Sequence, residues 1–359
     1  MSVTRRQMVK RGLAGAAVIA SGGLVWRAWD NGAFNPGGGP PYALWTDWRT
    51  AGLDGPLKVV RSGILAANAH NTQPWSFLIG ESSIALHADP ARNLGSFDPF
   101  RREMALSLGC AVENMVLAAN TLGGCTVVLP EPGHPTSGLN REVPVASLLL
   151  EAGAGKRDPL FEVIDRRHTN RGAYAGRAVS AEIRAGLGAL ASHADTRLLL
   201  FGENPQRNAL GRLIVSATET IIADPEMAAD SARWFRFSRA DIDRYRDGIT
   251  LDAAGLPPLV SIAAKLIPAP SAAVADRQWL DGTRDVHVAT APLLGMIAVR
   301  DLYDQANAIE AGRLWQRIHL WATVNGLAAH PLNQPVEVVD RARQLGKPPT
   351  AAGELAALT

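Results

Sequence analysis

Hydrophobic positions recur along most of the chain with helical spacing, and short strand-like runs interrupt them. Arg61 to Phe77 (RSGILAANAHNTQPWSF) shows the change most clearly. An apolar, helix-like stretch stops at the polar residues 69–73, and a strand-like run begins at Trp75. Periodic apolar residues predict a helix, and the polar break predicts a turn. The segment therefore predicts a helix, a polar turn and a strand.

Two long apolar segments resemble each other when the chain is shifted by 203 positions. The shift places five residues on identical ones, namely Ala105, Gly109, Leu117, Ala119 and Gly123 on Ala308, Gly312, Leu320, Ala322 and Gly326. Both segments are typical of core helices that end at a glycine. Shared helix physics could produce part of this similarity, but five identities favour an internal duplication.

The first residues match an export signal. Thr4 to Lys10 (TRRQMVK) fits the twin-arginine (Tat) pattern, and Gly12 to Val25 is apolar but too short for an ordinary membrane span. We expect residues 1–30 to be a signal read by the Tat translocon, which directs the protein to the periplasm or cell envelope. The alternative is that these residues form an ordinary basic, amphipathic N-terminal segment and not an export signal. An uncleaved N-terminal membrane anchor also stays open, because no clear cleavage site follows the apolar run.

The rest of the chain divides into three expected segments. Residues 31–55 form a Gly/Pro-rich linker and entry segment, 56–150 a first half, and 151–359 a second half. Within the second half, residues 223–272 have no counterpart in the first half and combine aromatic and basic residues with Pro and Gly. This insertion could form a lid over a ring-shaped ligand. Alternatively, it could be a surface segment that packs its aromatic side chains against the rest of the fold.

Composition excludes several classes of function. The 359 residues are 47% hydrophobic, and 36 basic against 34 acidic residues give a formal charge of +2, so no nucleic-acid partner is expected. Cys110 and Cys125 have no Cys or His at metal-ligand spacing, which predicts two buried free thiols and no metal site. Motifs of serine hydrolases, P-loop and Rossmann proteins and zinc proteases are missing from the sequence.

Two polar clusters carry candidate chemistry. Arg167, Thr169 and Arg171 precede a helix-like run at 179–183, and two guanidinium forks with a hydroxyl suit a phosphate. A solvated basic turn is the alternative. The second cluster lies in the turn before Trp75 and comprises Asn68, His70, Asn71 and Gln73.

Side-chain amides donate and accept hydrogen bonds at once, which suits a polar ring edge, although the second cluster could instead satisfy local backbone groups. Asn333, in Pro-Leu-Asn-Gln, is a weaker candidate because that stretch could simply turn the chain after the last core helix.

In order and spacing these elements resemble the FMN-binding nitroreductase superfamily, in particular its Acg-like branch, in which two halves are fused in one chain. The motifs that carry the resemblance are 70–75 (HNTQPW), 89–94 (DPARNL), 98–103 (DPFRRE), Glu113-Asn114, 169–171 (TNR), 326–334 and Glu337. The resemblance implies an α+β, three-layer fold, a mainly antiparallel sheet with helices, built from two related halves. It also implies non-covalent FMN, with the turn amides at the ring and Arg167, Thr169 and Arg171 at the phosphate.

The activity implied by this resemblance is oxidoreduction. Two electrons would pass from an unidentified reductant through FMN to a small acceptor such as a nitroaromatic or a quinone, and no side chain is singled out as catalytic. The alternative is a protein that binds or sequesters FMN with little turnover. Because related halves could form the usual dimer interface within one chain, a monomer or a loose dimer is expected.

Overall fold

The computed structural model describes residues 23, 25–48, 52, 54–202 and 205–359. The twin-arginine motif lies outside the described residues. The described chain combines helices with mostly antiparallel strands, which confirms the predicted α+β class. Among the described helices, none is long and apolar enough to cross a membrane.

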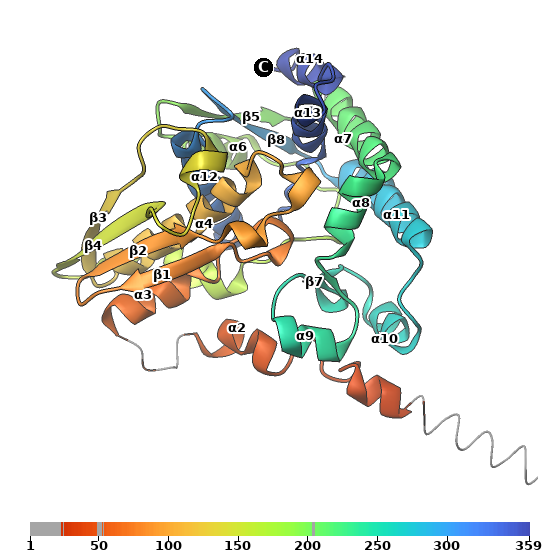
Figure 1. Cartoon of the computed structure of the whole chain (residues 1–359), viewed down its shortest axis with the longest axis horizontal. Coiled ribbons are helices and arrows are strands. Elements are labelled where there is room, and N and C mark those ends of the chain that lie inside the picture. The colour runs from red at the N-terminus through yellow and green to blue at the C-terminus, as the bar shows by residue number, and fades with distance from the viewer. Residues whose placement is uncertain (1–22, 24, 49–51, 53, 203–204) are drawn as a thin grey trace, which may run out of the picture.

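A four-stranded antiparallel sheet forms one outer layer (Figure 1). Its order is β1 (Trp75–Ile79), β2 (Ser83–Ala88), β4 (Ala146–Ala152) and β3 (Gly123–Val128). Alternate residues of β2, namely Ile84, Leu86 and Ala88, are buried, as expected when one sheet face meets a core. The strand predicted to start at Trp75 is confirmed.

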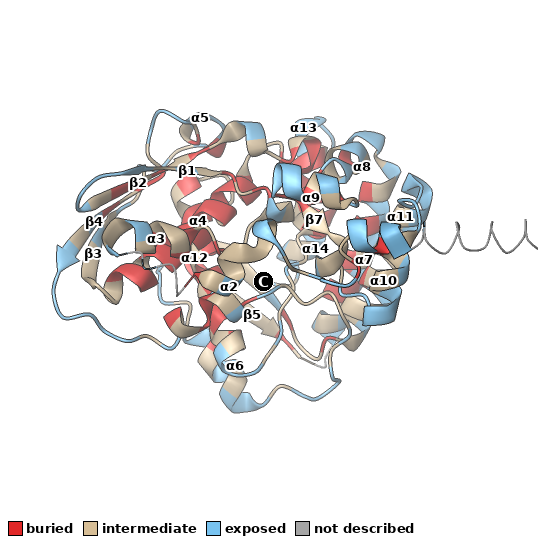
Figure 2. Cartoon of the chain, turned by 90° about the horizontal axis from the view of Figure 1, so that it is seen from below, coloured by how far each residue is buried: buried red, intermediate tan, exposed pale blue. Residues whose placement is uncertain are grey.

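Two long helices form the middle layer. α4 (Arg102–Asn120) contacts β2, β3 and β4, while α12 (Gln305–Val324) contacts β5 (Thr196–Phe201) and β8 (Leu294–Val299). β5 and β8 pair as a separate antiparallel ribbon. The helices therefore lie between two layers of strands, and their buried residues stand out in Figure 2.

α4 and α12 cross at the two glycines that the internal similarity aligned. A β-carbon at Gly109 would overlap the carbonyl oxygen of Ile309, and one at Gly312 would overlap that of Leu106. The shift of 203 positions converts the first contact into the second, because Gly109 corresponds to Gly312 and Leu106 to Ile309. The crossing thus has local two-fold symmetry, as expected for a duplicated helix that packs on its copy.

Polar pairs beside the crossing of α4 and α12 are related by the same shift of 203 positions. Glu113 accepts from Arg317 at 2.9 and 3.2 Å, and Asn114 accepts from Gln316 at 2.8 Å. The shift maps the pair Glu113 and Arg317 onto the pair Gln316 and Asn114. One symmetric position therefore holds an ion pair and the other an amide pair. Arg313 also bonds Glu113, at 3.0 Å, so both arginines of α12 have a carboxylate partner.

The remaining elements surround this centre. The α-helices are α2 (Ala43–Asp47), α3 (Gly55–Gly63), α5 (Pro135–Gly138), α6 (Ala181–Gly188), α7 (Pro205–Ala223), α8 (Pro225–Ala232), α9 (Arg239–Tyr245), α10 (Pro258–Leu266), α11 (Ala272–Asp281), α13 (Gln334–Gln344) and α14 (Thr350–Ala356). A short parallel pair, β6 (Phe235–Arg236) and β7 (Ile249–Thr250), lies within the insertion. Single 3-10 turns and one π-helix complete the list: Pro40–Tyr42, Ala69–Asn71, Pro90–Arg92, Gly95–Phe97, Phe161–Arg166, Leu251–Ala253 and the π-helix Gly282–Val288.

The Gly/Pro-rich segment is more ordered than the sequence suggested. Residues 31–39 form successive turns, and a 3-10 helix follows at Pro40–Tyr42. The segment packs on the insertion, since Arg239 donates to the Gly38 carbonyl at 2.8 Å and Tyr42 donates to Thr250 at 3.1 Å. These long-range contacts stabilise the turns, whereas the Gly/Pro-rich composition had predicted only a linker without regular structure.

Both cysteines are free. Cys110, in α4, is buried and donates to the Gly312 carbonyl at 3.2 Å, and burial raises the pKa of its thiol to about 12. Cys125, in β3, is only half-buried, which differs from the expectation of two buried thiols.

Candidate functional site

The polar turn before β1 has an unusual backbone. His70, Asn71 and Gln73 all have left-handed φ angles, of 50°, 54° and 51°. Asn68 holds the turn, because its Oδ1 accepts from the Gln73 amide at 2.8 Å and its Nδ2 donates to the Ala66 carbonyl at 3.1 Å. Such strain in residues with side chains persists only where the surrounding structure enforces it, and it is concentrated at functional sites.

The turn amides bind the insertion. Asn71 Nδ2 donates to the Gly248 carbonyl at 3.0 Å, and the Gly248 amide donates back to the Asn71 carbonyl at 3.0 Å. Gln73 Nε2 donates to the Arg246 carbonyl at 2.7 Å. These amides therefore have protein partners, whereas the sequence had suggested a ligand ring as their partner.

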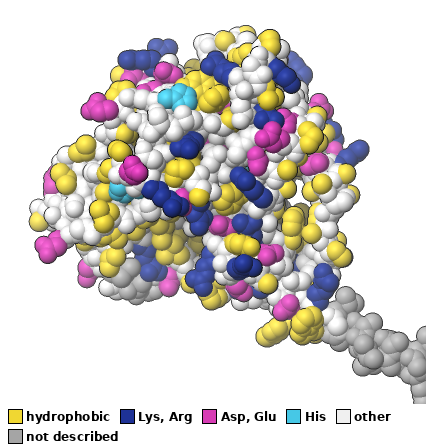
Figure 3. Space-filling model, viewed as in Figure 1, with side chains coloured by type: hydrophobic (Ala, Val, Ile, Leu, Met, Phe, Trp, Pro, Cys, Tyr) yellow, Lys and Arg dark blue, Asp and Glu magenta, His cyan; other side chains and the backbone are white. Residues whose placement is uncertain are grey.

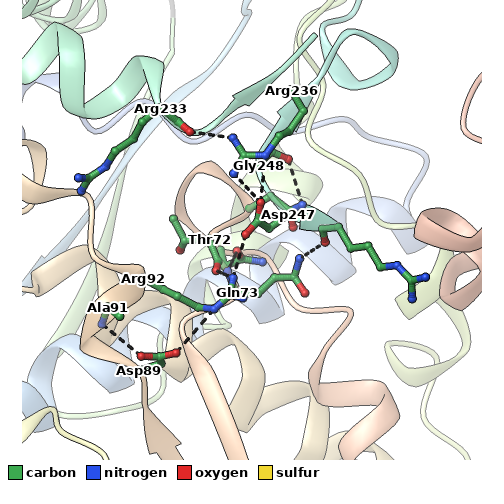
Figure 4. Close-up of polar contacts among 12 residues, drawn as sticks. Thr72, Gln73, Asp89, Ala91, Arg92, Arg233, Arg236, Asp247 and Gly248 are labelled. Atoms are coloured by element: carbon green, nitrogen blue, oxygen red, sulfur yellow. Dashed lines mark hydrogen bonds and ion pairs between the residues drawn. The ribbon is translucent and has the colours of Figure 1, made fainter. Parts of the chain in front are cut away.

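An ion-pair cluster reinforces the contact between turn and insertion (Figure 4). Arg92 donates to the Thr72 carbonyl at 2.8 Å and to Asp247 at 3.1 Å, and Arg236 reaches the other oxygen of Asp247 at 2.6 Å. Asp247 is buried between the two guanidinium groups. His70 adds a further contact, 3.0 Å from the Ser231 hydroxyl. The insertion is thus fastened to the turn by several independent bonds.

Replacing Asp247 by alanine should loosen the insertion. It leaves Arg236 buried without its carboxylate, which should lower the free energy of unfolding by about 3 kcal/mol. Limited proteolysis should then cut within residues 223–272 faster than in the wild type. Asp243→Ala is the matched control, because Asp243 pairs with Arg239 at an exposed position. Equal proteolysis of the two variants would show that Asp247 does not hold the insertion.

Arg167 is a buried charge without an acidic partner. It is 6% exposed, its Nη2 donates to the Leu65 carbonyl at 3.5 Å, and its guanidinium lies 5.5 Å from the centre of the Trp45 ring. Within the described part of the chain its Nε has no hydrogen-bond partner and no carboxylate pairs with it. Burial lowers the pKa of the guanidinium to about 10. A buried unpaired cation is unfavourable unless a ligand compensates it.

Arg171 is a second cation in the same surroundings. Its Nη1 donates to the Ala253 carbonyl of the insertion at 3.0 Å, and burial lowers its pKa. The described residues offer it no ion pair. Burial and then the charge of Arg171 lower the pKa of His70 to about 4, so that imidazole is neutral near pH 7. The turn and the arginine cluster therefore share one electropositive region.

Three further histidines belong to this region. His287 Nε2 lies 3.1 Å from the Arg171 carbonyl, and His319 Nε2 lies 2.9 Å from the His168 carbonyl. Because a carbonyl only accepts, both Nε2 atoms carry the proton and both Nδ1 atoms present a bare lone pair. The His330 ring lies 4.5 Å from that of His287. All three Nδ1 atoms are buried and, among the described residues, lack a partner.

Burial is the main reason that these imidazoles stay neutral. Burial, followed by the charge of Arg167, lowers the pKa of His319 to about 3, and burial, followed by His287 and Arg171, lowers that of His330 to about 2. The region therefore offers buried acceptors beside two cations. The hydrophobic periodicity of the sequence gives no reason to assign His287 or His319 to a binding site. His330 directly precedes the Pro-Leu-Asn-Gln stretch, and that position could have been noticed.

Thr169 and Asn333 lie at the edges of this region. Thr169 forms an isolated parallel bridge with Ala329, next to His330. Asn333 precedes α13, and its carbonyl accepts from the amides of Val336 and Glu337 at 2.9 and 3.1 Å. The bridge joins the arginine cluster to the loop after α12.

A buried carboxyl cluster adjoins the turn. Asp98, Glu103, Glu337 and Asp340 are all buried around one guanidinium, that of Arg102, which donates to Asp340 at 2.9 Å. Burial, then the neighbouring Glu103, raises the pKa of Asp98 to about 7, and the same causes raise that of Glu337. In the described part of the chain no group of His, Cys, Asp and Glu side chains could hold a metal ion.

Comparison with known proteins finds two similar proteins. The chain is 28% identical over 294 residues to two proteins of Mycobacterium tuberculosis, one from strain H37Rv and one from strain CDC 1551 / Oshkosh, each named "Putative NAD(P)H nitroreductase". The match spans 78% of this chain and 76% of each relative. These similarities support a relationship of this chain to the nitroreductase superfamily. No protein-family model matches the sequence.

Proposed function

We propose that this protein is an oxidoreductase of nitroreductase type that binds FMN non-covalently in the region around Arg167. The observation that carries the proposal is the buried guanidinium of Arg167, which has an unpartnered Nε and no carboxylate among the described residues. A phosphate dianion would supply the missing charge, because arginine binds phosphate oxygens through parallel N–H donors. The similarity to the two proteins named "Putative NAD(P)H nitroreductase" supports the oxidoreductase part of this proposal.

The other groups of the region fit the rest of this cofactor. The neutral His287 and His319 offer bare Nδ1 acceptors to N–H or hydroxyl groups, and Arg171 adds a second cation. Bound FMN would supply the two-electron redox chemistry, from a reduced nicotinamide donor to an electron-poor acceptor such as a nitroaromatic or a quinone. The residues of this chain would hold the phosphate, orient the ring system and exclude water from it.

A second candidate function is FMN binding with little turnover. It is favoured by the bonds that fasten the insertion to the turn, through Asn71, Gln73 and Asp247. An insertion held this firmly would restrict the access of donors and acceptors to the ring. The two candidates share the same site and differ only in whether the insertion opens.

The test begins with protein purified without added cofactor. A flavin absorbance spectrum, followed by steady-state oxidation of NADH or NADPH in the presence of a nitroaromatic or a quinone, would support the oxidoreductase. Bound flavin without oxidation of NADH or NADPH would support the candidate function of FMN binding with little turnover. In that case Asp247→Ala should increase turnover, because it frees the insertion. Colourless protein that does not bind added FMN would overturn both candidates.

A further inference from the structure

A patch of exposed apolar side chains lies where the first described residues meet α10. We call it the α10 patch, and its members, each between 49% and 81% exposed, are Trp26, Trp29, Phe34, Leu259, Val260 and Ile267. Hydrophobic side chains gather in this part of the surface, where the described part of the chain begins (Figure 3). Large apolar patches on a protein surface mark interaction sites.

Polar bonds join the two parts of the α10 patch. Asn31 Nδ2 donates to the Lys265 carbonyl at 2.8 Å, and Lys265 Nζ donates to the Gly32 carbonyl at 3.1 Å. Lys265 is itself buried and pairs with Asp252 at 2.5 Å. Trp29 and Ile267 therefore each lie within two residues of a bonded contact. The first described residues and α10 are thus held together as one surface.

We infer that the α10 patch rests in the interface of a lipid bilayer. The chain immediately before it, Gly12 to Val25, is apolar and follows Arg5, Arg6, Lys10 and Arg11. A basic stretch followed by an apolar one favours anionic bilayers, and its apolar part runs directly into Trp26. Tryptophan is the residue most typical of the boundary between headgroups and acyl chains. The patch would extend this contact from the N-terminal segment onto the folded protein.

A second exposed apolar surface, on the four-stranded sheet, lacks these features. On the outer face of the four-stranded sheet, Leu78, Val128 and Leu149 are exposed. They alternate with polar residues such as Ser76, Ser83 and Ser147, no tryptophan is among them, and the apolar N-terminal run does not lead into this face. Leu78 is 69% exposed, close to the exposure of the α10 patch residues, so it provides a matched control position.

The experiment uses the full chain and vesicles of phosphatidylethanolamine and phosphatidylglycerol. Co-sedimentation gives the partition coefficient of the wild type, of Leu259→Asp combined with Ile267→Asp, and of Leu78→Asp. We expect the double variant to partition about tenfold or more weakly, since it removes two exposed apolar anchors, and Leu78→Asp to match the wild type. Trp29→Ala provides a milder second variant, and circular dichroism confirms that each variant is folded.

Two results would overturn the inference. If all variants partition like the wild type, residues 1–22 alone hold the lipid and the α10 patch takes no part. If the wild type does not bind vesicles but forms a dimer, and the double variant is monomeric, a second copy of the chain covers the patch in place of a bilayer. Neither result bears on the proposed FMN site.

Discussion

Replacing Gly109 by alanine should lower the free energy of unfolding by about 3 kcal/mol or more, because α4 and α12 cross at this residue. The new β-carbon would overlap the carbonyl oxygen of Ile309, which is backbone and cannot turn aside as a side chain could. The helices would have to separate along their whole contact, which is the centre of the fold. Gly312→Ala should have a loss of similar size, because its β-carbon would overlap the Leu106 carbonyl in the symmetric position.

Chemical denaturation measures both effects against a helical glycine with open space. At Gly188, in α6, an added β-carbon meets nothing within 4 Å. Gly188→Ala should therefore raise the stability by about 0.5–1 kcal/mol through the better helix propensity of alanine. If Gly109→Ala and Gly312→Ala behave like Gly188→Ala, the helices do not approach as closely as described. A large loss at only one of the two glycines would contradict the local symmetry.

Replacing Arg167 by methionine should weaken FMN binding about tenfold to a hundredfold, which corresponds to about 1.5–3 kcal/mol for a hydrogen bond to a charged group. The same change should leave the stability of the cofactor-free protein unchanged or increase it by about 1–3 kcal/mol, since it removes a buried cation that has no acidic partner. Methionine keeps much of the apolar stem that lies beside Trp45. Opposite effects on affinity and stability distinguish a ligand-binding arginine from a structural one.

Arg300→Met is the matched control, because Arg300 is an exposed arginine paired with Asp195. Its removal should alter neither FMN affinity nor stability by more than about 1 kcal/mol. Thermal unfolding of cofactor-free protein and flavin fluorescence titration supply the two readouts. A loss of stability in Arg167→Met equal to its loss of FMN binding free energy would make Arg167 a structural residue.

Local patterns in the sequence were sufficient for the main helices and for the first strand. The apolar periodicity located α4 and α12, and the shift of 203 positions identified the glycines at which they touch. Both segments were expected to end at a glycine. Gly326, with φ 67°, closes α12 in this way, whereas Gly123 begins β3 two residues after the C-cap of α4. The difference arises because Gly123 has an extended partner strand to join.

The polar turn shows what the sequence could not supply. The sequence places Asn71 and Gln73 in one polar cluster, but their partners, Gly248 and Arg246, lie more than 170 positions away in the chain. Which groups satisfy an amide depends on tertiary contacts that local spacing does not encode. Arg167 was found because it stands in a compact motif. His287, His319 and His330 were not, since each comes from a different segment and only folding brings them together.

Flavin fluorescence titration of the wild type with FMN and with riboflavin tests the proposed site most directly, because the two ligands differ only in the phosphate. If Arg167 binds that phosphate, FMN should bind about tenfold to a hundredfold more tightly than riboflavin, and Arg167→Met should abolish the difference while leaving riboflavin affinity nearly unchanged. Equal affinities for FMN and riboflavin in the wild type, or an equal loss of both in Arg167→Met, would contradict the assignment of this region as an FMN phosphate site.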